Sequence, residues 1–330
     1  MFNLFSLCYK QGAMIMRELR IIEVKSEIGA GTRGASLGID AIKIAALDFG
    51  SRYFKQHSSV VVPDENHLLL ESVGNQYAKR ISGVLTMVER IAEEVSKTLK
   101  NKEFPILLSG DHSCSAGTIS GIRKAFPKSR LGVVWIDAHS DIHSPYTTPS
   151  GNLHGMPLAI ALDEDNIESK INKPDQETIN YWYQLKNVAN IAPKINYRDI
   201  VYIAMRDADP PEQYLLKKNK VKNFPTLEIR KRGVERVAID SLQYLDHCDM
   251  IYVSFDVDSL DASISKGTGT PVPNGISERE AGNLVARLMT SEKVCCFEMV
   301  EVNPTLDREN LMAENAFEIL LRATNSLIND

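Results

Sequence analysis

The stretch Trp135-Ile136-Asp137-Ala138-His139-Ser140-Asp141 decides both the fold class and the chemistry expected of this chain. It overlaps the apolar run 131–136, which predicts a strand buried on both faces. Because alternate residues of an extended chain share a face, Asp137, His139 and Asp141 can point into the same small volume. Carboxylate and imidazole groups suit Mn, Zn or Fe ions. For this stretch alone, an ordinary strand end that runs into a polar turn remains the alternative.

Two further strand ends carry the same kinds of side chain. One buried run ends in Ser109-Gly110-Asp111-His112-Ser113, and another closes with Asp256 and Asp258. We expect the first of these strands to neighbour the strand 131–136. Sites in open α/β sheets form at the carboxyl ends of strands, which makes His112 a candidate ligand. Two buried carboxylates side by side are costly without a cation, which favours a metal site over a bare acidic strand end.

The three strand ends supply six candidate metal ligands, which are His112, Asp137, His139, Asp141, Asp256 and Asp258. Zinc prefers about four ligands, so a set with this many oxygens fits one zinc ion poorly. It suits two divalent ions roughly 3.5–4 Å apart, which share carboxylates and a water. Such a pair lowers the pKa of the shared water towards neutrality and yields a hydroxide nucleophile.

The alternation of strand and helix patterns predicts an α/β protein, a three-layer αβα sandwich around a mainly parallel sheet. The metal site is expected at the carboxyl ends of the strands. Further strands are predicted from the apolar runs 19–24, 60–62, 200–205 and 294–300. Helical spacing of apolar residues predicts helices over 39–47, 77–99 and 311–328, and the capping box Ser277-Glu278-Arg279-Glu280 predicts the start of another.

The organisation of the chain is expected to be simple. Residues 1–18 are interpreted as an N-terminal extension that is disordered or precedes the natural start, since Met14 or Met16 could begin translation. Residues 19–330 are expected to form a single catalytic domain. The polar stretch 163–199 is interpreted as an insertion to which no task is assigned.

Composition narrows the class of protein. The chain has 330 residues, 43% of them hydrophobic, and a formal net charge of −5 with no long basic run, so nothing indicates a nucleic-acid partner. No apolar run approaches the roughly 20 residues that span a bilayer, and Met1 to Gln11 lacks the features of a signal peptide. Five cysteines without CxxC spacing indicate reduced thiols. We therefore expect a cytoplasmic protein that acts on a small molecule, away from membranes.

With these residues identified, the chain resembles the arginase (ureohydrolase) family from about Ile21 to Asn325. The resemblance rests on five specific motifs, which are Ser109-Gly110-Asp111-His112-Ser113, Asp137-Ala138-His139-Ser140-Asp141, Ser150-Gly151-Asn152-Leu153-His154-Gly155-Met156-Pro157, Ser254-Phe255-Asp256-Val257-Asp258 and Glu301-Val302-Asn303-Pro304. It implies a binuclear manganese centre, although Co²⁺ or Fe²⁺ would suit the same ligands. It also implies a homo-oligomer, a trimer or a hexamer.

The resemblance assigns each ligand to an ion. One ion would be held by His112, Asp137, Asp141 and Asp256. The other would be held by Asp137, His139, Asp256 and Asp258, so that Asp137 and Asp256 bridge the pair.

The resemblance also assigns substrate contacts. Asp209 and Glu212 would face the α-ammonium group of the substrate, and Ser150 and Asn152 its α-carboxylate. A further contact would come from Thr270.

The resemblance also assigns roles in the reaction, and the chain departs from the family pattern at a few positions. Glu301 would anchor the guanidinium group, and His154 would carry a proton to the departing amine. Asp258 would help to stabilise the tetrahedral intermediate. His143 stands where many members carry Asn, near the expected position of the substrate carboxylate, and Ala262 replaces a usual Pro after Asp261. Neither change removes a metal ligand.

The expected reaction is hydrolysis of L-arginine to L-ornithine and urea by a metal-bridging hydroxide. The alternatives are a related hydrolase acting on agmatine, guanidinobutyrate or formiminoglutamate, a zinc deacetylase of similar fold, or a binding protein that has lost catalysis. A deacetylase would leave the sixth ligand unexplained, and a protein without activity would be expected to lack ligands.

Overall fold

The computed structural model describes residues 18–328, and one parallel sheet runs through them. Its eight strands lie in the order β2-β1-β3-β8-β7-β4-β5-β6. Their bounds are β1 Leu19–Val24, β2 Ser58–Val62, β3 Phe104–Ser109, β4 Leu131–Ile136, β5 Ile200–Ile203, β6 Lys222–Phe224, β7 Met250–Asp256 and β8 Val294–Val300. The expectation for residues 1–18 falls almost wholly outside the described residues.

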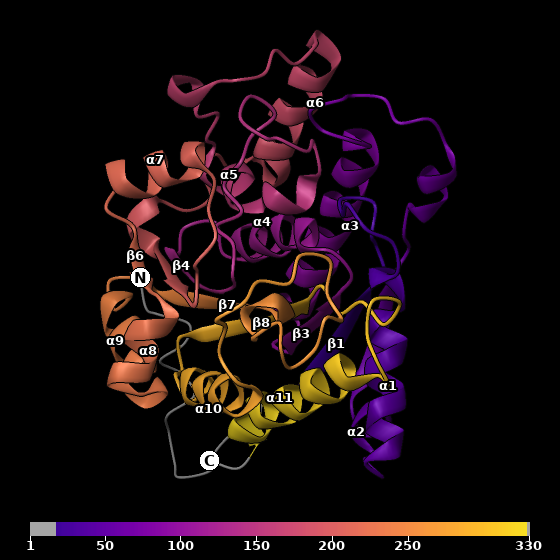
Figure 1. The fold of residues 1–330 in the computed structure, drawn as a ribbon, viewed down its shortest axis with the longest axis vertical. Coiled ribbons are helices and arrows are strands. Elements are labelled where there is room, and N and C mark those ends of the chain that lie inside the picture. The colour runs from indigo at the N-terminus through magenta and orange to yellow at the C-terminus, as the bar shows by residue number, and fades with distance from the viewer. Residues whose placement is uncertain (1–17, 329–330) are drawn as a thin grey trace.

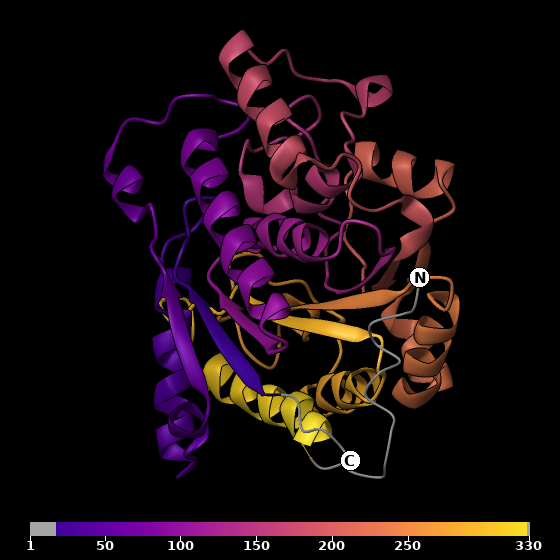
Figure 2. The same ribbon diagram turned by 180° about the vertical axis from the view of Figure 1, so that it is seen from behind.

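Helices cover both faces of this sheet, as Figures 1 and 2 show, and the predicted three-layer sandwich is confirmed. The helices are α1 Gly38–Asp48, α2 Tyr53–Gln56, α3 Ile81–Lys100, α4 Ser115–Ala125, α5 Pro157–Leu162, α6 Gln176–Asn187, α7 Pro210–Lys218, α8 Thr226–Arg232, α9 Val234–Tyr244, α10 Glu278–Met289 and α11 Leu311–Ile328. Across residues 18–328, none of them combines the length and the apolar character that crossing a membrane requires.

The two faces of the sheet pack into separate cores, because successive side chains of a strand point in opposite directions. In β4, Val134 and Ile136 join the core that α1, α9, α10 and α11 cover. Val133 and Trp135 join the opposite core, beneath α3, α4 and α5. Both faces of the strand are therefore buried, which explains its continuous apolar run.

The strand order corrects one expectation. We predicted that the strand before His112, β3, would lie beside β4, but β8 and β7 stand between them. β3 pairs with β8, and β4 pairs with β7, in each case in parallel. Local sequence pattern identifies strands but carries no information about which strand lies next to which. All eight strands are parallel, so their carboxyl ends still share one edge, and the site forms there.

The long helix α3 begins later than its apolar spacing predicts. The pattern starts at Tyr77, whereas the helix starts at Ile81, after Arg80 in the left-handed region with φ 56°. The preceding segment, 75–80, packs against another part of the chain instead, because the backbone N–H of Lys79 donates to the carbonyl oxygen of Gly151 at 2.8 Å. Contact with this distant loop has overridden local helical propensity.

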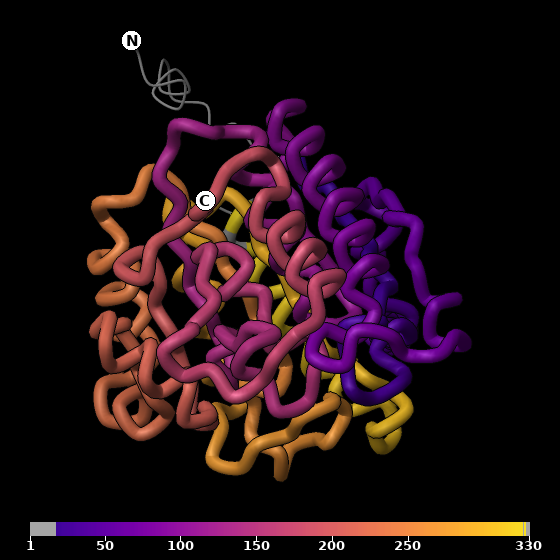
Figure 3. The backbone as a smooth tube through the Cα atoms, turned by 90° about the horizontal axis from the view of Figure 1, so that it is seen from above, coloured from indigo at the N-terminus to yellow at the C-terminus, as the bar shows by residue number. Residues whose placement is uncertain are grey.

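The polar stretch 163–199 has a folded structure of its own. It contains α6, whose first turn is capped by Asp175 accepting from the N–H of Thr178 at 2.7 Å. Trp182 of this helix is buried in the core beneath α3. The stretch lies at the top of Figure 1 and faces the viewer in Figure 3. It therefore packs against the main body through an apolar contact.

The close contact between the first turn of α1 and the segment after β8 can be tested by mutation. A Cβ atom at Gly38 would lie 2.1 Å from the carbonyl oxygen of Val302, in the backbone that follows β8. Gly38→Ala should lower the free energy of unfolding by about 1–3 kcal/mol, because the two segments must separate. Urea unfolding measures this loss.

Gly74→Ala is the matched control, since a Cβ atom there would meet nothing within 4 Å. Equal unfolding midpoints for the two variants would contradict this account of the contact.

Candidate metal centre

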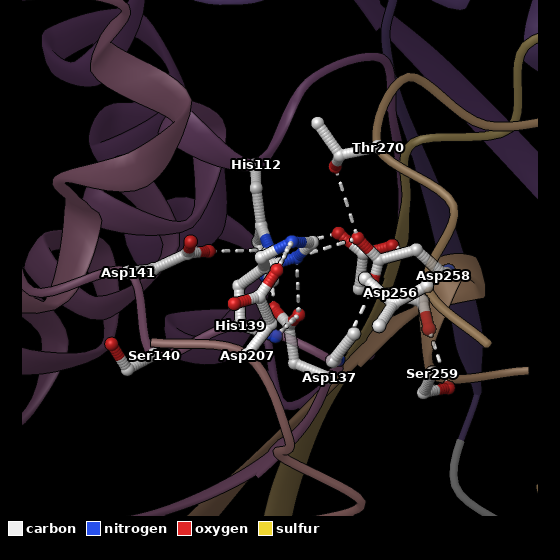
Figure 4. A network of polar contacts seen from close by, with 12 residues as sticks. His112, Asp137, His139, Ser140, Asp141, Asp207, Asp256, Asp258, Ser259 and Thr270 are labelled. Carbon is white, nitrogen blue, oxygen red and sulfur yellow. Dashed lines mark hydrogen bonds and ion pairs between the residues drawn. The ribbon is translucent and has the colours of Figure 1, made fainter. Parts of the chain in front are cut away.

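The six candidate ligands converge at the carboxyl edge of the sheet, as Figure 4 shows. His112 follows β3, and Asp256 ends β7. Asp258 lies in the short turn Val257–Ser259 directly after that strand. The other three ligands belong to the loop after β4, and they are Asp137, His139 and Asp141. The strands thus bring together residues that are far apart in the sequence.

One group of ligands surrounds His112. Its Nδ1 atom lies 3.1 Å from Asp137 Oδ2, 3.0 Å from Asp141 Oδ2 and 3.1 Å from Asp256 Oδ2. All four side chains are buried. Three carboxylate oxygens around one imidazole nitrogen form a set of donors that a single divalent cation can bind.

The ring of His112 is held in place from two sides. Its Nε2 atom lies 2.8 Å from the hydroxyl oxygen of Ser254, on β7. The ring of Trp135 stacks on it with a centroid distance of 4.1 Å and an interplanar angle of 3°. These contacts leave Nδ1 pointing at the carboxylates. Sequence reasoning missed both neighbours, because their contacts cross between strands and leave no local pattern.

A second group of ligands surrounds His139. Its Nδ1 atom lies 2.9 Å from Asp258 Oδ2 and 3.6 Å from Asp137 Oδ1. The carboxylate of Asp137 therefore contacts both imidazoles, His112 through one oxygen and His139 through the other. This is the position that a bridging ligand would occupy.

Backbone N–H groups fix the carboxylates. Asp137 Oδ1 accepts from the N–H of His139 at 2.6 Å, and Asp256 Oδ1 accepts from the N–H of Asp258 at 2.7 Å. Asp258 Oδ1 accepts from the N–H of Ala138 at 3.1 Å, which joins the two loops. In each of these residues Oδ2 stays directed at an imidazole. The spacing of two residues thus serves a local turn as well as a shared face.

Two buried atoms test whether metal ions fit this donor set. His112 Nδ1 and Asp137 Oδ2 have no hydrogen-bond partner, although they lie within ion-pair distance of each other. Their orientation is wrong for a hydrogen bond, and leaving such atoms unpaired inside a protein costs about 1–3 kcal/mol each. A divalent cation between them would satisfy both, so the residues present fit a metal.

Electrostatics lead to the same conclusion. Burial and the nearby charge of Asp137 raise the pKa of Asp141 to about 7. Burial and neighbouring carboxylates also raise the pKa of Asp256 and of Asp258. Burial acts against the charged form of Asp137 too, but the adjacent imidazoles of His112 and His139 hold its pKa below the usual range. Negative charge is thus concentrated where cations would relieve it.

A cavity of about 220 Å³ opens beside these ligands. Its walls include Asp141, Asp256 and Asp258 from the ligand set. They also include most of the predicted substrate contacts, which are His143, Ser150, Asn152, His154, Asp209, Glu212 and Thr270. The hydroxyl of Thr270 donates to Asp258 Oδ2 at 3.2 Å.

A pair of carboxylates beside His143 forms part of the cavity wall. His143 Nε2 lies 3.1 Å from Asp209 Oδ2 and 3.4 Å from Glu212 Oε2. Asp209 and Glu212 also form the capping box that begins α7. We expected His143 near the substrate carboxylate, but the structure places it against the two residues expected to face the ammonium group. It therefore orients this acidic pair.

Glu301 occupies a different place from the other predicted substrate contacts, behind His154. Glu301 Oε1 accepts from the N–H of His112 at 3.0 Å and lies 3.1 Å from His154 Nδ1. Burial alone would lower the pKa of His154, but Glu301 and further carboxylates raise it to about 9. Glu301 has φ 67°, a strained value for this residue. The predicted contact between Glu301 and a guanidinium group stays a prediction.

Arg206 is a further residue whose importance only the structure reveals. Its guanidinium donates to the carbonyl oxygens of Asp258 at 2.9 Å and Val272 at 2.8 Å. It also donates to the carbonyl oxygen of Ala204 at 3.0 Å. It thereby ties the loop that carries Asp258 to the end of β5. The sequence places Arg206 beside an acidic cluster but shows nothing of these carbonyl partners.

Comparison with known proteins places this geometry in a family. The family model "Arginase family" matches residues 17–325. The arginase of Bacillus subtilis (strain 168) is 34% identical over 305 residues, which cover 92% of this chain and 96% of that protein. Among solved structures, arginase from Bacillus caldovelox superposes with a TM-score of 0.81 at 30% identity, and covers 96% of this chain and 99% of that one.

A second solved structure is arginase from Entamoeba histolytica in complex with L-ornithine. It superposes with a TM-score of 0.79 at 26% identity, and covers 94% of this chain and 99% of that one. The family match spans nearly all of the described residues and includes each of the strand ends that carry a candidate ligand. This chain belongs to the arginase family.

Proposed function

We propose that this protein hydrolyses the guanidinium group of L-arginine, with L-ornithine and urea as products. The observation that carries the proposal is the ligand cluster with its unpartnered buried atoms, which opens to a cavity lined by further carboxylates. The family and its named relatives support the same reaction. The reaction consumes one water, whose oxygen ends in urea, and breaks the bond between the guanidinium carbon and the side-chain nitrogen of the substrate.

We infer that two Mn²⁺ ions occupy the cluster. His112 and Asp141 would belong to one ion, His139 and Asp258 to the other, and Asp137 and Asp256 to both. When bound, the ions would supply a water activated for attack at neutral pH and positive charge beside the developing anion.

The residues of the chain would orient the substrate and move the proton. His154 lies on the cavity wall, and its Nδ1 atom faces Glu301 at 3.1 Å. Glu301 thus holds the imidazole ready to pass a proton from Nε2 to the departing amine nitrogen. Glu301 Oε2 makes no hydrogen bond with the residues the structure describes, and it is the oxygen we assign to a guanidinium N–H. Asp258 would accept another N–H of that group.

Two sets of cavity residues would select the amino-acid part of the substrate, whose ammonium and carboxylate groups lie on the same carbon atom. Asp209 and Glu212, oriented by His143, suit an ammonium group. Ser150 and Asn152 offer a hydroxyl and an amide, which suit a carboxylate. L-Arginine carries both groups and would use both sets of contacts. Agmatine keeps the ammonium group but lacks the carboxylate, so it would use only the acidic pair. This arrangement favours L-arginine over the alternative substrates.

We also infer that residues 19–330 act as one catalytic domain, since a single sheet unites β1 with β8. The four cysteines in the described residues are free thiols, which suits the reducing environment of the cytoplasm. Exposed apolar side chains on and beside α1, including Leu47 at 73% and Phe49 at 57%, suit a subunit contact in a trimer or hexamer. Analytical ultracentrifugation should give the mass of a trimer or a hexamer. The mass of a monomer would contradict the inferred subunit contact.

Metal analysis tests the ligand assignment. Asp137→Ala should lose both ions, because Asp137 contacts both imidazole groups. His139→Ala should mainly lose one. The measurement is Mn²⁺ content per subunit after dialysis, with circular dichroism to verify folding. Equal content in wild type and Asp137→Ala would count directly against the shared ligand.

Urea release tests the function. Wild-type protein loaded with Mn²⁺ should release urea and ornithine from L-arginine, with kcat/KM at least about tenfold higher than for agmatine. Removal of the metal with a chelator should abolish the reaction, and Mn²⁺ should restore it. Absence of urea from L-arginine with fully loaded protein would refute the proposal.

A further inference from the structure

Lys79 contacts the side chain of Asn152, one of the residues that line the cavity. Its ammonium donates to Asn152 Oδ1 at 3.3 Å, and its backbone N–H donates to the carbonyl oxygen of Gly151 at 2.8 Å. Lys79 is half-buried and belongs to the segment 75–80, which precedes α3. Within residues 18–328 its charge is not compensated by an ion pair, since no carboxylate there lies within ion-pair distance of it.

The backbone around Asn152 fixes the position of its side chain next to Lys79. Gly151 has φ 76°, and a Cβ atom there would lie 2.1 Å from the carbonyl oxygen of Gln76. On its other side Asn152 meets the loop after β1, where a Cβ atom at Gly31 would lie 2.6 Å from Asn152 Nδ2. The amide is therefore confined between two segments distant in the sequence, and its orientation depends on both.

The contact with Lys79 determines which atoms Asn152 offers to a ligand. An amide side chain has an oxygen that accepts and a nitrogen that donates. The ammonium of Lys79 occupies the oxygen. The nitrogen makes no hydrogen bond within the part of the chain that the structure describes, so its N–H groups remain for a ligand. A carboxylate accepts such bonds, and the nearby positive charge of Lys79 strengthens them.

We propose that Lys79 is a specificity-determining residue for the substrate carboxylate, acting by positioning Asn152 and by placing a positive charge behind it. The inference rests on the proposed function for the identity of the substrate. It assigns opposite charges to the contacts of the two groups on the substrate α-carbon, with Asp209 and Glu212 beside the ammonium group and Lys79 behind the residue that meets the carboxylate. An L-amino acid carries the complementary pair of charges, whereas a decarboxylated or amidated analogue lacks one of them.

Steady-state kinetics with two substrates test this role. L-Arginine and L-argininamide share the guanidinium and α-amino groups, and the amide lacks the carboxylate charge. Lys79→Met should raise KM for L-arginine roughly 5- to 20-fold, with kcat within about twofold of wild type. KM for L-argininamide should change by less than about twofold. Lys79→Arg should recover most of the affinity for L-arginine, because it keeps a positive donor.

Lys55→Met is the matched control, since Lys55 is an exposed residue of α2. It should leave both KM values unchanged. Equal losses for the two substrates in Lys79→Met would indicate a structural role and overturn the proposal, as would no loss for either. A fall in kcat with KM unchanged would also overturn it.

A binding measurement separates this inference from the proposed function. Should the wild type release no urea from L-arginine, calorimetry with L-ornithine and with 1,4-diaminobutane still tests Lys79. Lys79→Met should weaken binding of L-ornithine roughly 5- to 20-fold and leave that of 1,4-diaminobutane within about twofold. Failure to bind L-ornithine better than the diamine in wild type would overturn the role of Lys79.

Discussion

Mutual repulsion among four buried carboxylates is the constraint on which the rest of this structure depends. Asp137, Asp141, Asp256 and Asp258 meet in a region with little access to water. Without compensation such an arrangement would be expelled or protonated. The chain partly offsets the repulsion with two imidazoles and with backbone N–H groups that hold one oxygen each of Asp137, Asp256 and Asp258. The remaining deficit of positive charge is what a pair of divalent cations would supply.

The ligands could be predicted from the sequence because each group of them falls within a short motif. In Asp137-Ala138-His139, the spacing of two residues gives both a shared face and a turn that fixes the first carboxylate. Buried strands before each motif were equally visible, as continuous apolar runs. The strand order could not be predicted, since pairing of β3 with β8 depends on residues almost two hundred positions apart. β6, α7 and α8 were also missed because they are short, and α9 was missed although its apolar residues recur at helical spacing.

Residues that support the site were harder to find than those that form it. Trp135, Ser254 and Arg206 act on the ligands through contacts between strands and loops, and nothing in their flanking sequence marks them. Lys79 lies in a segment whose apolar spacing favoured helix, and only its contact with Gly151 and Asn152 shows its place. The candidate metal ligands lie on the sheet edge, whereas most of the proposed substrate contacts lie in loops beside it.

The strand order also has a consequence for biosynthesis. β7 and β8 are the last strands to leave the ribosome, yet they occupy the middle of the sheet. Before they emerge, the strands β2-β1-β3 and β4-β5-β6 are two separate ribbons, each with an apolar edge that has no partner. The nascent chain must keep these edges from pairing wrongly until residues 250–300 arrive between them. Only then can Asp256 meet His112, so the proposed metal site cannot be complete until β7 has been synthesised.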